Sequence, residues 1–175
     1  MNNLKSIKQI AYIRNILNQK SYKGIFNPVN KDKYIGKFPI NFKSGYELKF
    51  MQYCDLCENI KKWGYETHII EYVDFLNKTS DNSPIIRRYF TDFYVEYYNP
   101  INNQIKKCLI EIKSSNQVKP PIRGKNKETL LEKQKIFIKN MEKWKAAKEY
   151  CKKHNMDFYI ITEQQLNKSN FNFIA

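Results

Sequence analysis

The chain lacks several patterns that mark whole classes of protein function. Its apolar runs are too short to span a bilayer, and residues 1–20 alternate apolar and basic side chains without the apolar core of a signal peptide. No Gly-rich phosphate loop is present, so nothing supports an ATP-driven role or a nucleotide cofactor. We therefore expect a soluble, intracellular protein whose partners include neither a membrane nor a nucleotide cofactor.

Cysteine and histidine are too few and too scattered for a metal cluster or a disulfide framework. The chain has 4 cysteines and 2 histidines. Cys54 and Cys57 lie within one predicted helix, and the other two cysteines have no paired spacing, whereas a tetrahedral zinc site needs two further ligands. Neither histidine lies near a Ser or Cys nucleophile pattern. We expect reduced thiols, as in a cytoplasmic compartment, and histidines with structural roles.

Positive charge is the most unusual feature of the composition. The 31 Lys and Arg residues against 17 Asp and Glu residues leave a net charge of +14, which suits a polyanionic partner, above all nucleic acid. AT-rich coding would also enrich Asn, Ile and Lys, so it is a competing explanation for the lysines. The 42% hydrophobic and 15% aromatic content predicts a folded chain, and 175 residues suit a single domain.

Hydrophobic periodicity predicts an α/β protein. A loop is expected over residues 21–41, and Ser44 is suited to cap the helix that follows it. Helices are predicted at residues 1–19, 44–59 and 129–154, with a last helical turn at 163–166. Strands are predicted at residues 67–75, 89–98, 105–113 and 157–162.

An Asp on one predicted strand and a Glu-x-Lys triplet on the next form the main candidate for chemistry. Side chains alternate across a strand, so Glu111 and Lys113 share one face while Ile112 points into the core. If the hairpin is centred on its turn at residues 99–103, Asp92 faces Glu111. The same register pairs Val95 with Cys108 and Glu96 with Lys107, which are favourable cross-strand pairs.

Neighbouring carboxylates raise each other's pKa unless a cation lies between them. An oxygen-only site favours Mg²⁺, with Mn²⁺ as a substitute, and such an ion can activate a water molecule and polarise a phosphate. Lys113 would position that water or neutralise developing charge. Glu47, on an upstream helix, could complete the metal shell directly or through water. Alone, the Glu-x-Lys triplet is most often a solvated strand face.

Four of these residues match a known motif in order and context. Glu47, Asp92, Glu111 and Lys113 resemble the active site of the PD-(D/E)XK nucleases, which have the restriction-endonuclease-like fold. Within them the chain resembles the head completion nucleases of T-even-like bacteriophages. The resemblance runs from about residue 22 to residue 166, through YKGIFNPVNKDKYIG, SGYELKFMQYCD, RRYFTDFYVEY, LIEIKSSNQVKPP, KWKAAKEYC and DFYIITEQQL.

The resemblance implies a central mixed sheet of about four strands flanked by helices, in a nuclease domain at residues 22–166. A basic helical extension at 1–21 would precede it and a tail at 167–175 would follow. The implied catalytic residues are Glu47, Asp92, Glu111 and Lys113, and the implied metal site combines the three carboxylates with Ile112. Thr91 replaces the usual Pro before Asp92, and that Pro binds no metal.

The implied activity is metal-dependent endonuclease or exonuclease cleavage of DNA in the completion of phage heads after packaging. The implied partners are DNA and head or portal proteins, and the implied location is the virion or the host cytoplasm. Two alternatives remain open. One is a structural head-closure or DNA-binding protein that keeps the nuclease fold with little turnover, and the other is a nuclease of the transposition or recombination type.

A basic segment follows the Glu-x-Lys strand, at residues 119–148. Lysines suit contacts with DNA phosphates, so we expect the DNA backbone to run along this segment. A solvated basic helix face is the alternative interpretation. The residues expected to bind DNA are Lys119, Arg123, Lys125, Lys127, Lys135, Lys139 and Lys143.

Overall fold

The computed structural model describes residues 22–123, 125–168 and 171–174, so the predicted N-terminal extension lies outside the described residues. The strands are β1 (Gly24–Phe26), β2 (Ile40–Phe42), β3 (Ile60–Tyr65), β4 (Ile69–Lys78), β5 (Pro84–Phe90), β6 (Phe93–Tyr98), β7 (Ile105–Lys113) and β8 (Asp157–Thr162). The helices are α2 (Gly45–Leu56), α3 (Lys127–Lys153) and α4 (Glu163–Leu166), with 3-10 turns at Lys31–Lys33 and Ser115–Gln117.

A four-stranded mixed sheet forms the centre of the molecule, in the order β3-β6-β7-β8. β6 runs antiparallel to both β3 and β7, whereas β7 and β8 are parallel and are joined through α3. A parallel pair requires a long crossover connection, and α3 supplies it. The predicted α/β fold with a mixed sheet of about four strands is confirmed.

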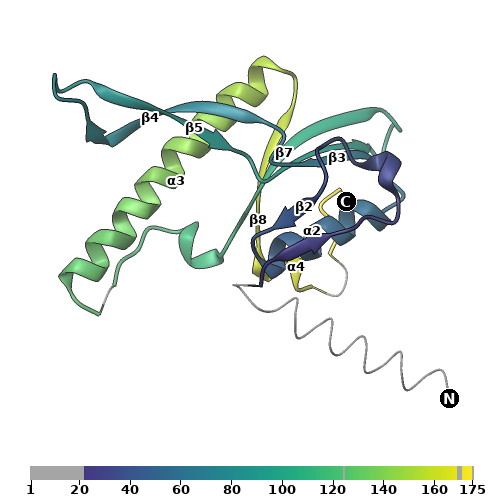
Figure 1. Ribbon diagram of the computed structural model, residues 1–175, viewed down its shortest axis with the longest axis horizontal. Helices are drawn as coiled ribbons and strands as arrows, with labels where there is room; N and C mark the ends of the chain where they lie inside the picture. The colour runs from purple at the N-terminus through teal and green to yellow at the C-terminus, as the bar shows by residue number, and fades with distance from the viewer. Residues whose placement is uncertain (1–21, 124, 169–170, 175) are drawn as a thin grey trace.

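Each face of this sheet is covered by different elements. Figure 1 shows α2 with the β1–β2 ribbon on one side of β7 and β8, and α3 with the β4–β5 hairpin on the other. Ile110 and Ile112 point into the larger core, whereas Leu109 packs in the core on the α3 side. The predicted alternation along β7 is therefore correct. Glu111 lies on the α3 side, where it is only 2% exposed rather than solvated.

The β3–β6 pair of the sheet and the β4–β5 pair beyond it form one bent hairpin. β3 pairs with β6 and β4 pairs with β5, all antiparallel, and the register changes between the two ribbons. Tyr65 lies opposite Phe93, whereas Ile69 lies opposite Phe90. The segment between β3 and β4 therefore carries one residue more at the bend than the segment between β5 and β6. Such a β-bulge bends a strand and redirects a side chain, and bulges are common beside active sites. Asp92 lies at this bend.

Three predictions of secondary structure were wrong. The continuous strand predicted at residues 89–98 is broken between β5 and β6. The loop predicted at residues 21–41 contains β1 and the beginning of β2, which pair with each other. The helix predicted to continue to about residue 59 ends at Leu56, and β3, which follows it, was not predicted.

Both long helices have side-chain caps at their N-termini. Ser44 accepts a hydrogen bond from the Glu47 amide and begins α2, as predicted, and Asn126 accepts one from the Thr129 amide and begins α3. Within α3 the buried residues are confined to the second half, from Asn140 onward. The first half of α3 therefore extends beyond the core, beside the loop that follows β7 (Figure 1).

The segment after α4 also contributes to the core. Ile174 is buried, and Phe171 and Phe173 pack against Phe50 and Tyr53 of α2. All four cysteines are free thiols, in agreement with the prediction. Among the described residues, no helix is both long enough and apolar enough to cross a membrane.

Candidate active site

Asp92 lies next to β7 because of the register of the β6–β7 hairpin. Val95 is opposite Cys108 and Glu96 is opposite Lys107, as predicted from the turn between the strands. At the end of the ladder the Ile112 amide donates a 2.7 Å hydrogen bond to Asp92 Oδ2. The bulge and this bond together hold the Asp92 side chain against the strand that carries Glu111.

Glu111 and Lys113 are in direct contact on the α3 side of the sheet. Lys113 Nζ lies 2.6 Å from Glu111 Oε1, and the lysine side chain is 25% exposed. The second oxygen of the carboxylate, Oε2, accepts a hydrogen bond from the Tyr89 hydroxyl. The buried carboxylate is thus held between a cation and a phenol, and the cation retains access to solvent.

Glu47 lies beside this group, in the first turn of α2. Its Oε2 atom accepts hydrogen bonds from the Lys43 amide at 2.7 Å and from the Tyr65 hydroxyl at 2.6 Å. Its charge influences Asp92 and Lys113. The structure therefore brings Asp92, Glu111 and Lys113 together and places Glu47 close enough to act on them electrostatically.

The electrostatics of the site show an excess of negative charge. Burial and the neighbouring Glu111 raise the pKa of Asp92 well above its usual range, and they outweigh Lys113 and the Ile112 amide, which lower it. Burial alone would lower the pKa of Lys113, but the attraction of Asp92 and Glu111 raises it above its usual value. One lysine does not fully compensate the carboxylates, so the site favours an additional cation.

The donor atoms suit a hard divalent cation that keeps part of its hydration. In the described part of the chain, no three His, Cys, Asp or Glu side chains lie close enough together to hold a metal ion by themselves. Mg²⁺ is commonly bound by only one or two carboxylates together with waters and substrate phosphates. Asp92 and Glu111 fit that pattern. A metal site at Asp92, Glu111, Ile112 and Glu47 stays a prediction.

Two tyrosines and the position of one lysine are parts of the site that sequence reasoning missed. Tyr65 and Tyr89 each donate to one of the glutamates, and they reach the site from β3 and from the end of β5. Lys143 on α3 lies over the rings of Tyr89 and Tyr72, at 5.3 and 5.7 Å from their centroids. Burial lowers the pKa of Lys143. Only the adjacency of Tyr89 to the motif around Asp92 could have drawn attention to it.

Part of the predicted DNA-binding segment lines a concave surface. The loop after β7 and the first half of α3 enclose a pocket of about 610 Å³. Lys119 and Arg123 line it, as does Lys133, and Phe137 and Gln164 complete its wall. The pocket begins at Ser115, two residues after Lys113. Cations therefore line a hollow whose first residue follows the Glu111–Lys113 strand closely along the chain.

The other predicted DNA-binding residues are spread along α3. Lys125 and Lys127 are exposed at its beginning, and Lys135 forms a surface ion pair with Glu132 at 3.0 Å. Lys139 is half-buried and interacts electrostatically with Asp74 of β4. The structure brings Lys119 and Arg123 to one pocket, and contact of the seven residues with DNA stays a prediction.

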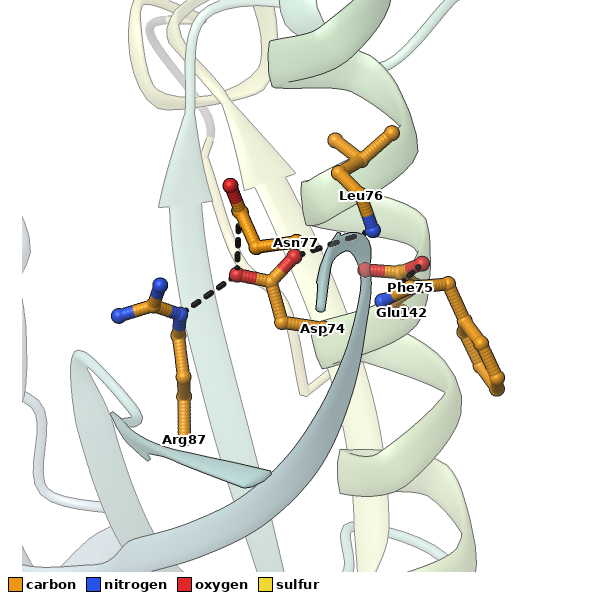
Figure 2. Close-up of polar contacts among 6 residues, drawn as sticks. All are labelled: Asp74, Phe75, Leu76, Asn77, Arg87 and Glu142. Carbon is orange, nitrogen blue, oxygen red and sulfur yellow. Dashed lines mark hydrogen bonds and ion pairs between the residues drawn. The ribbon is translucent and has the colours of Figure 1, made fainter. Parts of the chain in front are cut away.

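A second polar cluster fastens the β4–β5 hairpin to α3 (Figure 2). Asp74 has no exposed side-chain surface and accepts hydrogen bonds from Arg87 Nε at 2.5 Å and from Asn77 Nδ2 at 2.9 Å. Glu142 of α3 accepts a 3.3 Å bond from the Phe75 amide. Hydrogen bonds lower the pKa of Asp74 even though burial opposes them. This carboxylate is fully satisfied and needs no further ligand.

Three features together define a nuclease of the PD-(D/E)XK type: the mixed sheet flanked by helices, Asp92 at the bend opposite the bulge, and the strand that carries Glu111 and Lys113. Residues 57–163 match the family model for the N-terminal region of TnsA-like endonucleases, and the chain belongs to this family. The match includes Asp92, Glu111 and Lys113, whereas Glu47 lies before it.

A relative in a bacteriophage extends this likeness over most of the chain. The protein is 30% identical over 157 residues to the head completion nuclease of Enterobacteria phage T4. The alignment covers 86% of this chain and 97% of the phage protein. The resemblance inferred from the sequence motifs is confirmed.

Proposed function

We propose that this nuclease hydrolyses DNA phosphodiester bonds with Mg²⁺, or with Mn²⁺ as a substitute, and that it acts in the completion of phage heads after DNA packaging. The observation that carries the metal-dependent reaction is the convergence of Asp92, Glu111 and Lys113 in a site where the pKa of Asp92 is raised. Carboxylates that repel each other in this way are typical of cation sites at catalytic centres.

The residues that would hold the ion are Asp92 and Glu111, with the Ile112 carbonyl, and with Glu47 acting directly or through water. A bound divalent cation would supply a Lewis acid for the phosphate and would lower the pKa of a bound water molecule. Glu47 is oriented toward Tyr65 and the Lys43 amide by its two hydrogen bonds. It would therefore reach the ion most easily through a water molecule.

Lys113 is the candidate for stabilising the charge that develops on the phosphate. Because the neighbouring carboxylates raise its pKa, it is protonated at neutral pH, and part of its side chain remains exposed. Its ammonium group can donate to a phosphate oxygen or to the attacking water while it stays beside Glu111. A fixed donor in a poorly solvated site stabilises charge more strongly than the same donor in water.

DNA would approach the site along the loop after β7 and the first half of α3. The pocket with Lys119, Arg123 and Lys133 adjoins Lys113 along the chain. These cations suit phosphate contacts that do not depend on base sequence. Lys143, an α3 lysine that we expect to bind DNA, lies over the Tyr89 ring and interacts electrostatically with Glu111 and Asp92.

The role in head completion rests on the relative in phage T4. That protein is named a head completion nuclease, and the likeness covers nearly its whole length. By this proposal the partners include DNA and head or portal proteins, and the protein is found in the virion or the host cytoplasm. A protein that kept the fold only for head closure or DNA binding would not require the Asp92 carboxylate.

The decisive experiment is a cleavage assay on linear, nicked and branched DNA with Mg²⁺, Mn²⁺ or excess chelator. We expect cleavage only with a metal and none with the Asp92→Ala or Glu111→Ala variants. Undiminished cleavage in chelator would exclude the metal mechanism. Binding without cleavage under all metal conditions would instead support a structural role. Phage particles depleted of this protein, with their DNA ends and tail attachment examined, would test the role in head completion.

A further inference from the structure

The Glu111 carboxylate has two polar contacts, and the proposed mechanism gives a role only to the one with Lys113. Lys113 Nζ approaches Oε1, and the Tyr89 hydroxyl donates to Oε2. These two contacts engage one oxygen each of a carboxylate that is only 2% exposed, so together they define its orientation. Without the hydroxyl, rotation would bring both oxygens toward the ammonium group.

The position of Tyr89 is itself tightly determined. It is 3% exposed, and it lies near the end of β5, just before the bend at which Asp92 lies. Lys143 lies over its ring at 5.3 Å from the centroid, within the range of a cation–π interaction. Tyr89 also belongs to the core that α3 and β4 form on this side of the sheet. The ring therefore cannot move without repacking that core.

We propose that Tyr89 is a positioning residue of the active site, whose hydroxyl keeps one oxygen of Glu111 directed away from Lys113 so that the carboxylate can bind the divalent ion. This inference rests on the proposed metal-dependent function. Groups that orient a metal ligand without touching the metal commonly change metal affinity or activity by about 10- to 100-fold. The structure also supplies a matched control in Tyr72.

Tyr72 resembles Tyr89 in its exposure, its core and its contact with Lys143, but not in the partner of its hydroxyl. It is 5% exposed, belongs to the same core, and its ring also lies beneath Lys143, at 5.7 Å. Within the described residues its hydroxyl donates to no carboxylate of the site. Tyr72→Phe and Tyr89→Phe therefore remove the same atom from similar surroundings, and only Tyr89→Phe frees Glu111.

The test compares wild type, Tyr89→Phe and Tyr72→Phe by Mn²⁺ binding and by DNA cleavage over a range of metal concentrations. For Tyr89→Phe we expect Mn²⁺ to bind about 10-fold more weakly or worse, an unchanged KM for DNA, and partial recovery of kcat at high metal concentration. Tyr72→Phe should match wild type in all three. The melting temperature of Tyr89→Phe should fall modestly, because Glu111 Oε2 loses its donor, whereas Tyr72→Phe should melt close to wild type.

Each outcome has a defined meaning. Unchanged Mn²⁺ affinity and kcat in Tyr89→Phe, with an active wild type, would overturn the positioning role. Equal losses of Mn²⁺ affinity and kcat in both variants would also overturn it, since the hydroxyl would then be a general structural element. If the wild type itself neither binds Mn²⁺ nor cleaves DNA, the proposed function has failed rather than the role of Tyr89.

Discussion

Two aspartates on the same bent hairpin show how the surroundings of a carboxylate separate structure from chemistry. Asp74 of β4 accepts hydrogen bonds from Arg87 and Asn77, and these bonds lower its pKa (Figure 2). Asp92 lies at the bulge beside Glu111, and burial with that second carboxylate raises its pKa. Asp74 has its hydrogen-bond partners within the fold, whereas Asp92 lacks sufficient positive charge beside it, which a bound cation would supply.

The difference follows from what the neighbouring strand presents. Opposite the Asp74 region β5 supplies an arginine, whereas the strand beside Asp92 supplies a glutamate. Partnered buried charges contribute to the fold, and like charges held together cost stability while they create a site for a cation. Substitution at the two positions should therefore have opposite effects on stability and on activity.

The largest expected effect is the loss of catalysis in Asp92→Asn. The substitution keeps the shape of the side chain but removes one of the two carboxylates proposed to bind the metal, so cleavage should fall on the order of 1000-fold or more. The melting temperature of the metal-free protein should stay near that of wild type or rise, because the repulsion from Glu111 disappears. Cleavage rates and thermal melts measured in parallel would test this, and an active or strongly destabilised variant would show that Asp92 is structural.

Asp74→Ala should show the converse pattern. Removing this carboxylate leaves the Arg87 guanidinium and the Asn77 amide without their acceptor, which should cost about 1–3 kcal/mol of unfolding free energy. The rate constant for cleavage should stay close to that of wild type at temperatures where the variant is folded. Urea unfolding and single-turnover cleavage are the measurements. A stable but inactive Asp74→Ala would mean that the hairpin takes part in chemistry.

The two aspartates should also give opposite slopes of stability against pH. Because the pKa of Asp92 is raised on folding, the metal-free folded state holds its proton more tightly, so stability should fall as pH rises from about 4 through the raised pKa. The pKa of Asp74 is lowered on folding, so its contribution should be present above about pH 4 and lost as pH falls through the lowered pKa.

Urea unfolding midpoints in chelator, measured across this pH range, would separate the two contributions. Asp92→Asn should remove the fall of stability with rising pH, and Asp74→Asn should remove the loss at low pH. If Asp92→Asn left the profile unchanged, the charge of Asp92 would already be compensated within the protein.

The register of the β6–β7 hairpin could be predicted from the sequence because two local signals agree there. The turn at residues 99–103 and the alternation along Ile105–Lys113 both specify the same pairing, which places Asp92 near Glu111. Ser44 and the long helix to about residue 154 could be predicted for a similar reason, since caps and periodicity are local.

The bulge and the two tyrosines could not be predicted in this way. Aromatic and β-branched residues continue through Thr91 without a break. The extra residue lies among residues 66–68 on the opposite segment, and it becomes apparent only when β3 and β4 are paired with β6 and β5. The chain has 13 tyrosines, and only the closeness of Tyr89 to Asp92 along the chain sets either of the two apart from the others. Their roles arise from contacts 18 and 22 residues away along the chain.

The smallest expected effect concerns basic side chains that have no acidic partner in the described part of the chain, in comparison with one that has. Arg87 is bound to Asp74, whereas Arg123, Lys125 and Lys127 are exposed, and within the described residues none of these three forms an ion pair. Replacing the three by Ala should therefore leave the unfolding free energy within about 0.5 kcal/mol of wild type. For every DNA phosphate that one of these side chains neutralises, its replacement should reduce the salt slope of binding by about 0.9 on duplex DNA.

Binding should be measured with the Asp92→Asn protein, which cannot cleave its substrate, over a series of salt concentrations and on two unrelated sequences. We expect the triple variant to bind with a shallower slope on both sequences alike, because Lys and Arg contacts to phosphates carry no sequence information. Arg87→Ala serves as the paired-cation control and should change stability but not the slope. An unchanged slope in the triple variant would show that the loop does not touch DNA, and a strong preference for one sequence would show that bases are read.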